Sequence, residues 1–412
     1  MRNQLAHSGR KVVWLALAAS MIACGSAKQS STIGSDSAAE EGGNFRLRAV
    51  IALPGRPLTA FDISWVEEPT QTYYLADRTN AGVDFFDAQN NTFTTRVTGF
   101  VGADPRGNDF SGPNGILTIT SLHELWAGDG PGPQMNSSVK VIDLNSDPPS
   151  IVATIHTGGT RRTDEMSYDG EDHILAAVNN ADDPPFLTLI STRSRTILRR
   201  ITFDETLAHR FGETSFSNGL EQSVFNPQTH LFYLSVPELS GVNANGAVAV
   251  INPGTQEVTQ LFRVHNCQPA GLALGLDNNL LVGCSDPSRT VVMNAEDGRI
   301  VREILEIGGS DEVWFNRGDR HYYLAARDNP SGPKLGVVDA ESNRLITAVT
   351  TAFNAHSVAA DRQNNHVFVP LRPPRAGHPE DPNTCVDFGG HQFDGRGCIG
   401  VYWSADDGEA GN

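Results

Sequence analysis

The sequence lacks the short motifs that identify several large enzyme classes. It contains no Gly-x-x-x-x-Gly-Lys-Ser/Thr loop, with which P-loop nucleotide hydrolases bind phosphate, and no Gly-x-Ser-x-Gly elbow, with which α/β-hydrolases present a serine nucleophile. It has no Cys-x-x-Cys-His, so covalent c-type haem is unsupported, and no recurring Trp-Asp pair of the kind that marks WD40 repeats. No single motif therefore assigns a function.

Positive charge is also scarce. The chain has 31 Lys and Arg residues against 48 Asp and Glu residues, a formal net charge of −17. Loss of Arg2, Arg10 and Lys11 with an N-terminal signal would bring the charge to about −20. Such a field repels nucleic acid and anionic lipid headgroups, so nucleic acid is excluded as a partner. The charge favours solubility and can attract cationic ligands.

The N-terminal apolar run is too short to cross a bilayer. Residues 12–23 are mostly apolar and follow the basic residues Arg2, Arg10 and Lys11. A membrane-spanning helix needs about 20 apolar residues, whereas a shorter run after basic residues is typical of an export signal. We therefore predict a signal peptide over residues 1–23.

Cys24 stands at the end of this segment. The residues Met21-Ile22-Ala23-Cys24 resemble a bacterial lipobox, with Met21 where Leu is usual. The resemblance implies acylation of Cys24, palmitate included, and a lipid anchor in the cell envelope, at the outer membrane or on the periplasmic face. An ordinary cleaved signal with a chance cysteine is the alternative. Residues 24–44 have few large apolar groups and are predicted to be a disordered tether.

Long amphipathic helical patterns are absent as well, and short β-type runs take their place. Residues 308–350 hold four such runs separated by turn residues, which is the size of one propeller blade. A single blade cannot bury both of its faces, so the pattern must repeat. Together with 40 Gly and 23 Pro residues, this pattern predicts an all-β protein.

The repeat occurs seven times. One landmark residue marks the first strand of each unit, and the landmarks are spaced about 41 to 57 residues apart, as in propellers. The landmarks are Asp62, Asn114, Asp164, Glu221, Ala270, Asp311 and His356.

The last unit stops after its third strand, near Trp403, whereas residues 45–53 supply a spare strand. Pairing these two segments completes the seventh blade and closes the ring. We therefore predict a seven-bladed β-propeller with four-stranded blades over residues 45–404, followed by a disordered tail over 405–412. Two separate sandwich domains are the alternative architecture.

Four segments carry a resemblance to a known family. LADRTNAGVDFFD, SSVKVIDL, AVAVINP and AHSVAADRQNNHVFVPL resemble the repeats of bacterial YncE or YVTN seven-bladed propellers. The resemblance covers residues 45–403 and implies the fold. It leaves the function open, because propellers of this kind include binding proteins, surface-layer components, haem-bearing domains and lactonases.

Four cysteines remain after Cys24, an even number that suits an oxidising compartment. Cys267 and Cys284 flank one predicted strand pair, and Cys385 and Cys398 bracket a Gly-rich excursion. Two disulfides with these pairings are predicted. Zinc binding with His391 is the alternative, although the spacing matches no common zinc motif.

The landmark residues are the candidate site. In a propeller the first strands lie nearest the axis, so six polar landmarks, all except Ala270, should converge on the mouth of the central channel. Carboxylates brought this close raise one another's pKa values unless a cation neutralises them. Asp164, Glu221, Asp311 and His356 are therefore candidate ligands for a divalent metal such as Ca²⁺, Mn²⁺, Fe²⁺ or Zn²⁺.

The neighbours Glu165, Gln222 and Glu312 complicate this assignment. Because adjacent residues on a strand point in opposite directions, one residue of each adjacent pair should face the axis. We assign Asp62, Asn114, Glu165, Gln222 and Glu312 as candidate ligand-binding residues. In lactonase-like propellers an axial metal activates water, and here His356 or Glu221 would accept the proton.

Three functional classes follow from these residues. The first is an envelope lipoprotein that binds a small molecule or divalent cation at the channel mouth. The second is a metal-dependent hydrolase or lyase that uses the same acidic and histidine ring. The third is a non-catalytic scaffold with a protein partner. Polar residues that merely hydrogen-bond water in the channel are the plainest alternative to all three.

Overall fold

The computed structural model describes residues 44–405, which fold into seven four-stranded antiparallel sheets. Each sheet is one blade, and the prediction of a seven-bladed propeller is confirmed. The strands of the first four blades are β2 (Ser64–Glu67), β3 (Thr72–Asp77), β4 (Gly82–Asp87) and β5 (Thr92–Thr98); β6 (Ile116–Ile119), β7 (Glu124–Asp129), β8 (Ser138–Asp143) and β9 (Ser150–His156); β10 (Met166–Asp169), β11 (Ile174–Asn179), β12 (Phe186–Ser191) and β13 (Thr196–Thr202); β15 (Ser223–Asn226), β16 (Leu231–Val236), β18 (Asn245–Asn252) and β19 (Glu257–His265).

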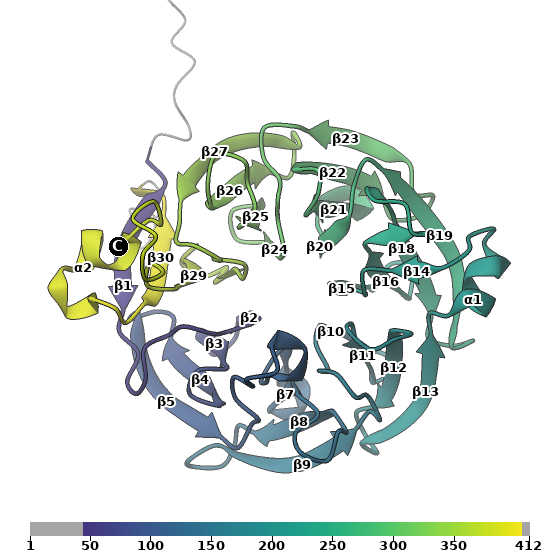
Figure 1. Cartoon of the computed structure of the whole chain (residues 1–412), viewed down its shortest axis with the longest axis horizontal. Helices are drawn as coiled ribbons and strands as arrows, with labels where there is room; N and C mark the ends of the chain where they lie inside the picture. Colours follow the sequence, from purple (N-terminus) through teal and green to yellow (C-terminus); the bar gives the residue numbers. More distant parts are fainter. Residues whose placement is uncertain (1–43, 406–412) are drawn as a thin grey trace, which may run out of the picture. The chain divides into compact units, whose positions relative to one another are not determined.

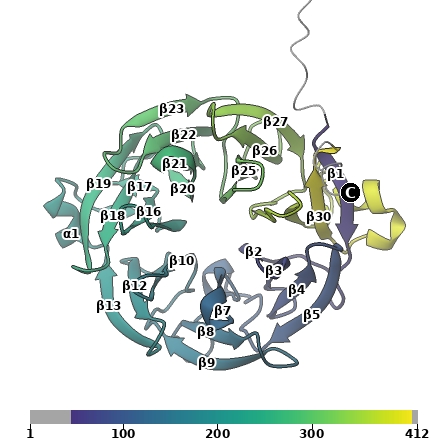
Figure 2. The same ribbon diagram turned by 180° about the vertical axis from the view of Figure 1, so that it is seen from behind.

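The strands of the remaining three blades are also given from the innermost to the outermost. They are β20 (Pro269–Leu274), β21 (Asn279–Cys284), β22 (Arg289–Asn294) and β23 (Ile300–Ile304); β24 (Val313–Asn316), β25 (His321–Ala326), β26 (Lys334–Asp339) and β27 (Arg344–Thr350); β28 (Ala359–Ala360), β29 (Val367–Leu371), β30 (Cys398–Trp403) and β1 (Arg46–Ile51). The short first strands surround the axis and the fourth strands lie on the outside, as both views of the ring show (Figure 1 and Figure 2).

The N-terminal strand closes the ring. β1 pairs antiparallel with β30, from Arg46 opposite Trp403 to Ile51 opposite Ile399. The seventh blade is thus built from both ends of the described chain, as the spare strand at residues 45–53 predicts. Closure leaves no blade with an unpartnered face, which is how propellers avoid long exposed sheet edges.

The hydrophobic core is divided into seven layers, one between each pair of neighbouring blades. Every large cluster of buried apolar side chains draws its members from two adjacent blades. The cluster that joins the seventh blade to the first, for example, contains Phe368 and Ile399 from one side and Tyr73 and Phe86 from the other. Because the core lies between blades, the axis itself is not needed for apolar packing.

Burial along the strands follows from this layering. The second and third strands are covered on both faces by neighbouring blades, so residues such as Tyr73, Leu75 and Val83 are fully buried. The fourth strands have one face toward solvent and alternate accordingly, as in β9, where exposed and partly buried residues take turns. Each blade also has a register shift where its outermost strand pairs with the next strand inward. Bulges of this kind increase the local twist.

Two insertions decorate the ring, and both predicted disulfides are present. The first insertion carries helix α1 (Glu205–Arg210) and a small sheet of β14 (Phe216–Ser217) with β17 (Glu238–Leu239). The second carries helix α2 (Thr384–Gly389). Cys267 is bonded to Cys284 and Cys385 to Cys398, with S–S distances of 2.01 and 2.15 Å. The short 3-10 helices are η1 (Asn108–Phe110), η2 (Thr120–Leu122), η3 (Leu276–Asn278) and η4 (His391–Phe393).

The N-terminal predictions fall outside this part of the chain. The predicted signal peptide, Cys24 and residues 25–43 of the predicted tether lie outside the described residues, as do residues 406–412. Within residues 44–405, none of the helices has the length and apolar character needed to traverse a bilayer.

Candidate functional site

Two cavities follow one another along the propeller axis. The first, of about 310 Å³, lies where the first strands begin and is lined by five of the seven landmark residues, all except Asn114 and Ala270, and by four arginines; we call it the polar chamber. The second, of about 360 Å³, lies further along the same strands and is lined by Trp65, Trp314 and other apolar side chains; we call it the aromatic chamber. Ile63, Glu165 and Glu312 line both cavities and mark the level at which they meet.

The polar chamber gathers charge of both signs. Its walls include seven carboxyl groups and four guanidinium groups. The carboxyl groups belong to Asp62, Asp109, Asp164, Glu165, Glu221, Asp311 and Glu312, and the guanidinium groups to Arg78, Arg162, Arg327 and Arg372. The convergence of the acidic landmarks that the sequence predicts is therefore present, but it is accompanied by arginines that the prediction did not include.

Three of these arginines neutralise three of the acidic landmarks. Arg78 forms an ion pair with Asp62 inside the same blade. Arg162 and Asp164 lie 2.7 Å apart from nitrogen to oxygen, and the distance between Arg327 and Asp311 is also 2.7 Å. The cation that the clustered carboxylates require is thus supplied by the protein itself at these three positions.

Three of the four arginines occupy a repeated position in the sequence, and the fourth, Arg162, stands two residues before its landmark. Arg78, Arg327 and Arg372 each follow the last residue of a second strand, in LADR, LAAR and VPLR. Because the second strand runs antiparallel to the first, its end lies beside the start of the first strand and therefore beside the landmark. A comparison of second-strand ends as well as first-strand starts would have found them.

Asp62 is the most heavily bonded carboxylate of the chamber. Burial acts to raise its pKa, but Arg78, the hydrogen bond with His356 and Arg162 act more strongly and hold the pKa well below its usual range. Arg78 also donates hydrogen bonds from Nε and Nη2 to Asn114 Oδ1, at 3.0 and 2.7 Å. This group is a fixed network that joins the first two blades.

His356 is held on three sides. Its ring stacks on Phe61 with centroids 4.6 Å apart, Nδ1 lies 2.8 Å from the Asn354 carbonyl oxygen, and Nε2 lies 3.3 Å from Asp62 Oδ1. Both ring nitrogens are engaged within the protein. In this arrangement His356 therefore has no free ring nitrogen with which to act as the predicted proton acceptor.

Four carboxyl groups remain without a balancing arginine, and three of them are glutamates at the centre of the chamber. Among residues 44–405, the side chains of Glu165 and Glu221 form no hydrogen bond or ion pair, whereas Glu312 lies beside the Ser357 hydroxyl but its Oε1 is buried without a partner. Burial, together with the neighbouring carboxylates, raises the pKa of each of the three well above its usual value. Burial likewise raises the pKa of Asp164 to about 7, although Arg162 opposes the shift. The fourth group, Asp109, is exposed at the rim.

The expectation that only one residue of each adjacent pair faces the axis is wrong. Asp164 and Glu165 both line the polar chamber, and so do Asp311 and Glu312. The regular strands begin only at Met166 and Val313, so the acidic pairs precede the stretch in which side chains alternate between faces.

Two predicted ligand-binding residues instead connect parts of the protein. Asn114 is fully buried, lines neither chamber, and donates hydrogen bonds from Nδ2 to the carbonyl oxygens of Ser111 and Thr163 while Oδ1 accepts from Arg78. Gln222 Oε1 accepts hydrogen bonds from the backbone amides of Leu272 and Val313, at 2.6 and 3.2 Å. Gln222 thereby ties three blades together at the floor of the aromatic chamber.

The predicted metal ligands do not form a coordination shell. No group of three or more His, Cys, Asp and Glu side chains within residues 44–405 is placed to hold a metal ion. Asp164 and Asp311 are directed to arginines and His356 to Asp62, which leaves Glu221 as the one unpaired member of the predicted set. The residues present therefore do not fit a divalent metal.

Comparison with known proteins supports the fold alone. No family model and no curated protein matches the chain. Among solved structures, hydrazine synthase of Kuenenia stuttgartiensis is similar with a TM-score of 0.58, over 76% of this chain and 92% of that chain, at 11% sequence identity. At this identity the similarity shows the propeller fold alone.

Proposed function

We propose that this protein is a ligand-binding propeller whose polar chamber takes up a small organic cation. The observation that carries the proposal is the set of carboxyl groups left without an ion pair after the arginines are assigned, namely the buried Glu165 and Glu312 and the half-buried Glu221. Buried carboxyl groups without partners are costly, because each gives up its hydration. A protonated amine inside the chamber would balance the negative charge of these carboxyl groups and donate the hydrogen bonds that they lack.

The volume and polarity of the chamber support this class of ligand. A cavity of about 310 Å³ accommodates a molecule of a few to a dozen heavy atoms, within the usual range for small-molecule sites. An organic ammonium needs no fixed coordination shell, in contrast to a divalent metal. The three Arg–Asp pairs hold the walls in place, so the chamber does not have to be ordered when the ligand binds.

Calorimetric titration with putrescine tests the proposal, with butanediol as a neutral analogue of the same length. We expect putrescine to bind and butanediol not to bind. Because the unpaired carboxyl groups have raised pKa values, binding should release protons, which appears as a heat that changes with the ionisation enthalpy of the buffer.

Two glutamates of the same blade provide the matched variants. Glu221→Gln removes an unpaired carboxyl group of the chamber and should weaken putrescine binding about tenfold or more. Glu257→Gln removes an exposed carboxyl group on the outer strand β19 and should leave the affinity unchanged. Equal affinities for the two variants would show that putrescine binds only to the acidic surface.

A hydrolase or lyase at the same chamber is the second candidate. The raised pKa of Glu221, caused by burial and by the nearby Asp311, is the feature that favours it, because a carboxylate of this kind can accept a proton at neutral pH. Two measurements test this candidate. The first is metal analysis of the purified protein, and the second is turnover of lactone substrates by the original protein and by Glu221→Gln. Turnover that survives the substitution excludes Glu221 as the proton acceptor.

We also propose that the propeller is exported and anchored in the cell envelope through a lipid on Cys24. The two disulfides support export, because such bonds persist in oxidising compartments. Palmitate labelling should be found on the original protein and be lost in Cys24→Ser. Labelling that persists after this substitution contradicts the anchor.

A further inference from the structure

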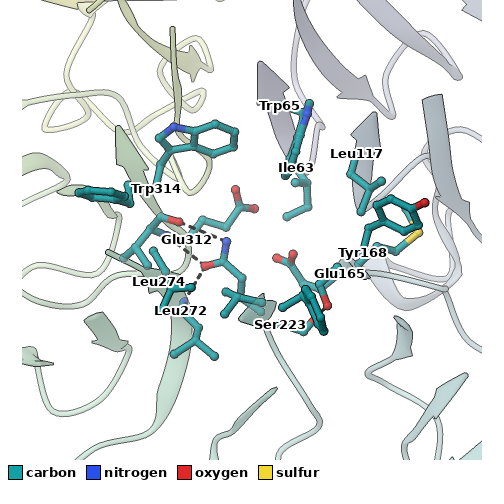
Figure 3. A pocket seen from close by; sticks show the side chains of 18 of the residues that line it. Ile63, Trp65, Leu117, Glu165, Tyr168, Ser223, Leu272, Leu274, Glu312 and Trp314 are labelled. Carbon is teal, nitrogen blue, oxygen red and sulfur yellow. Dashed lines mark hydrogen bonds between the residues drawn. The ribbon is translucent and has the colours of Figure 1, made fainter. Parts of the chain in front are cut away.

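We infer that the aromatic chamber is a second binding site, which takes a primary amine carrying an aromatic or branched aliphatic group. This inference rests in part on the proposed function, because the two chambers share the Glu165 and Glu312 carboxyl groups. Its walls are mainly apolar and its floor is acidic, and Figure 3 shows the Glu165 and Glu312 carboxyl groups pointing into the space that the labelled side chains enclose.

The aromatic walls come from equivalent positions in different blades. Trp65 and Trp314 each stand three residues after their landmark, in the first and sixth blades, and the intervening seventh blade carries the small Ala359 at that position. The gap allows the two indole rings to meet edge to face, with centroids 5.0 Å apart and an angle of 78°. Leu117 and Leu274 extend the apolar wall on the other blades.

Both tryptophans remain partly exposed, in contrast to Trp126 in the second blade, which is fully buried. The Trp65 indole nitrogen donates a hydrogen bond of 3.0 Å to Thr118 Oγ1, which fixes its ring. A rigid, partly exposed pair of indoles is a prepared surface for an apolar or aromatic group.

The floor specifies the polar end of the ligand. Glu312 is 3% exposed and its Oε1 has no hydrogen-bond partner among the described residues, and the Glu165 side chain, 7% exposed, has none either. Two carboxyl oxygens that lack donors call for a group with several N–H bonds and a positive charge. A primary ammonium carries three donors, and the indole faces above it add a favourable cation–π interaction.

Three ligands with one phenyl group and different ends test this inference: phenethylamine, phenethyl alcohol and hydrocinnamate. Binding is followed by the tryptophan fluorescence of the purified protein at pH 6 and pH 8. We expect phenethylamine to bind most tightly and hydrocinnamate not to bind. The preference for the amine over the alcohol should grow as pH rises, because the floor carboxyl groups, whose pKa values burial raises, lose their protons while the amine keeps its own.

Substitutions then locate the site. Trp314→Phe should remove most of the fluorescence change, and Glu312→Gln should weaken phenethylamine about tenfold or more while leaving phenethyl alcohol unaffected. Glu257→Gln is the control, because Glu257 is exposed on the outer strand β19 and lines neither chamber. It should leave phenethylamine binding unchanged.

Several results would overturn the inference. Equal affinity for the amine and the alcohol at pH 8 would exclude the acidic floor as the determinant. Loss of phenethylamine binding in Glu221→Gln but not in Trp314→Phe would place the amine in the polar chamber instead. Absence of binding by all three ligands would exclude the aromatic chamber as a site, whatever putrescine does.

Discussion

The two chambers share one floor but are built in opposite ways. The polar chamber is lined by charged groups, among which three arginines are paired with aspartates and four carboxyl groups have no arginine partner. The aromatic chamber is lined by apolar groups and contains unpaired carboxyl oxygens at its base. The same seven strands produce both, because residues at their starts and residues further along face successive levels of the axis.

The difference shows how charge can serve two purposes within one channel. Carboxylates paired with arginines fix the relative positions of neighbouring blades, and their removal should unfold the protein. Carboxyl groups without a partner contribute nothing to that framework, and their removal should affect ligand binding and the response to pH. Four variants test this comparison, in order of decreasing effect.

The largest effect is expected for Arg78→Ala. The substitution leaves the buried Asp62 and Asn114 without their main partner, and the loss of one partner of a buried ion pair costs about 3–5 kcal/mol of unfolding free energy. Arg372→Ala is the matched control, because Arg372 follows the second strand of its blade in the same way but makes no ion pair among the described residues. Urea denaturation should show a change within about 1 kcal/mol for the control. Similar losses for both variants would contradict a structural role specific to Arg78.

Gln222→Ala comes second. It leaves the backbone amides of Leu272 and Val313 without their acceptor at the floor of the aromatic chamber, which should cost about 1–3 kcal/mol. Gln260→Ala, on the exposed face of β19 in the same blade, serves as the control and should be nearly neutral. If both substitutions are neutral in urea denaturation, Gln222 does not brace the blades and is free to serve as a ligand-binding residue.

The third prediction concerns pH. Burial raises the pKa values of Glu165 and Glu312 in the folded protein, so the folded state holds their protons more tightly than the unfolded state. Stability should therefore fall over the pH interval that begins near the ordinary glutamate pKa of 4.5 and extends up to the raised pKa values of the folded protein. The variant with both Glu165→Gln and Glu312→Gln should lose less of its stability over this interval and be more stable at pH 8 by at least about 1 kcal/mol.

Melting temperatures at a series of pH values provide the measurement. Glu257→Gln should retain the slope of the original protein, because its carboxyl group is exposed. Asp62 does not contribute to this slope, because its lowered pKa affects stability only at lower pH. A slope that is unchanged in the double variant would show that the two glutamates are ionised at neutral pH.

The smallest effect is expected for Trp65→Phe. It removes the hydrogen bond to Thr118 and alters the edge-to-face contact with Trp314, which together contribute about 1 kcal/mol. Thr118→Val removes the hydrogen bond alone and should cost less. A loss well above this value in Trp65→Phe would mean that the tryptophan pair belongs to the structural core rather than to a binding surface.

The fold could be predicted because its signals are local and repeated. Short β-type runs, turn residues between them and a landmark at each first strand are all visible in the sequence, and the spare strand before Leu53 implied the closure by β1. The bulges beside the outer strands were not predicted, because a register shift depends on the pairing of two strands and leaves no mark on either one alone.

The site could be predicted only in part. The acidic landmarks do meet at the axis, but Arg78 reaches Asp62 from the end of the following strand, a relation that a comparison of first strands cannot show. The metal hypothesis takes these carboxylates without the arginines. Trp65 and Trp314 occupy equivalent positions, but they lie three residues beyond the landmarks, so a comparison of strand starts alone does not reveal the aromatic chamber.

The closure of the ring also determines when β1 can pair during synthesis of the chain. Arg48 of β1 donates a hydrogen bond to the carbonyl oxygen of Trp403, a residue 355 positions later. At typical rates of synthesis, roughly 20 to 70 seconds separate the appearance of these two residues. Throughout that time β1 has no strand to pair with, and a nascent chain that ends before Cys398 cannot complete the seventh blade. β1, which is synthesised before the other strands described here, is therefore among the last to pair.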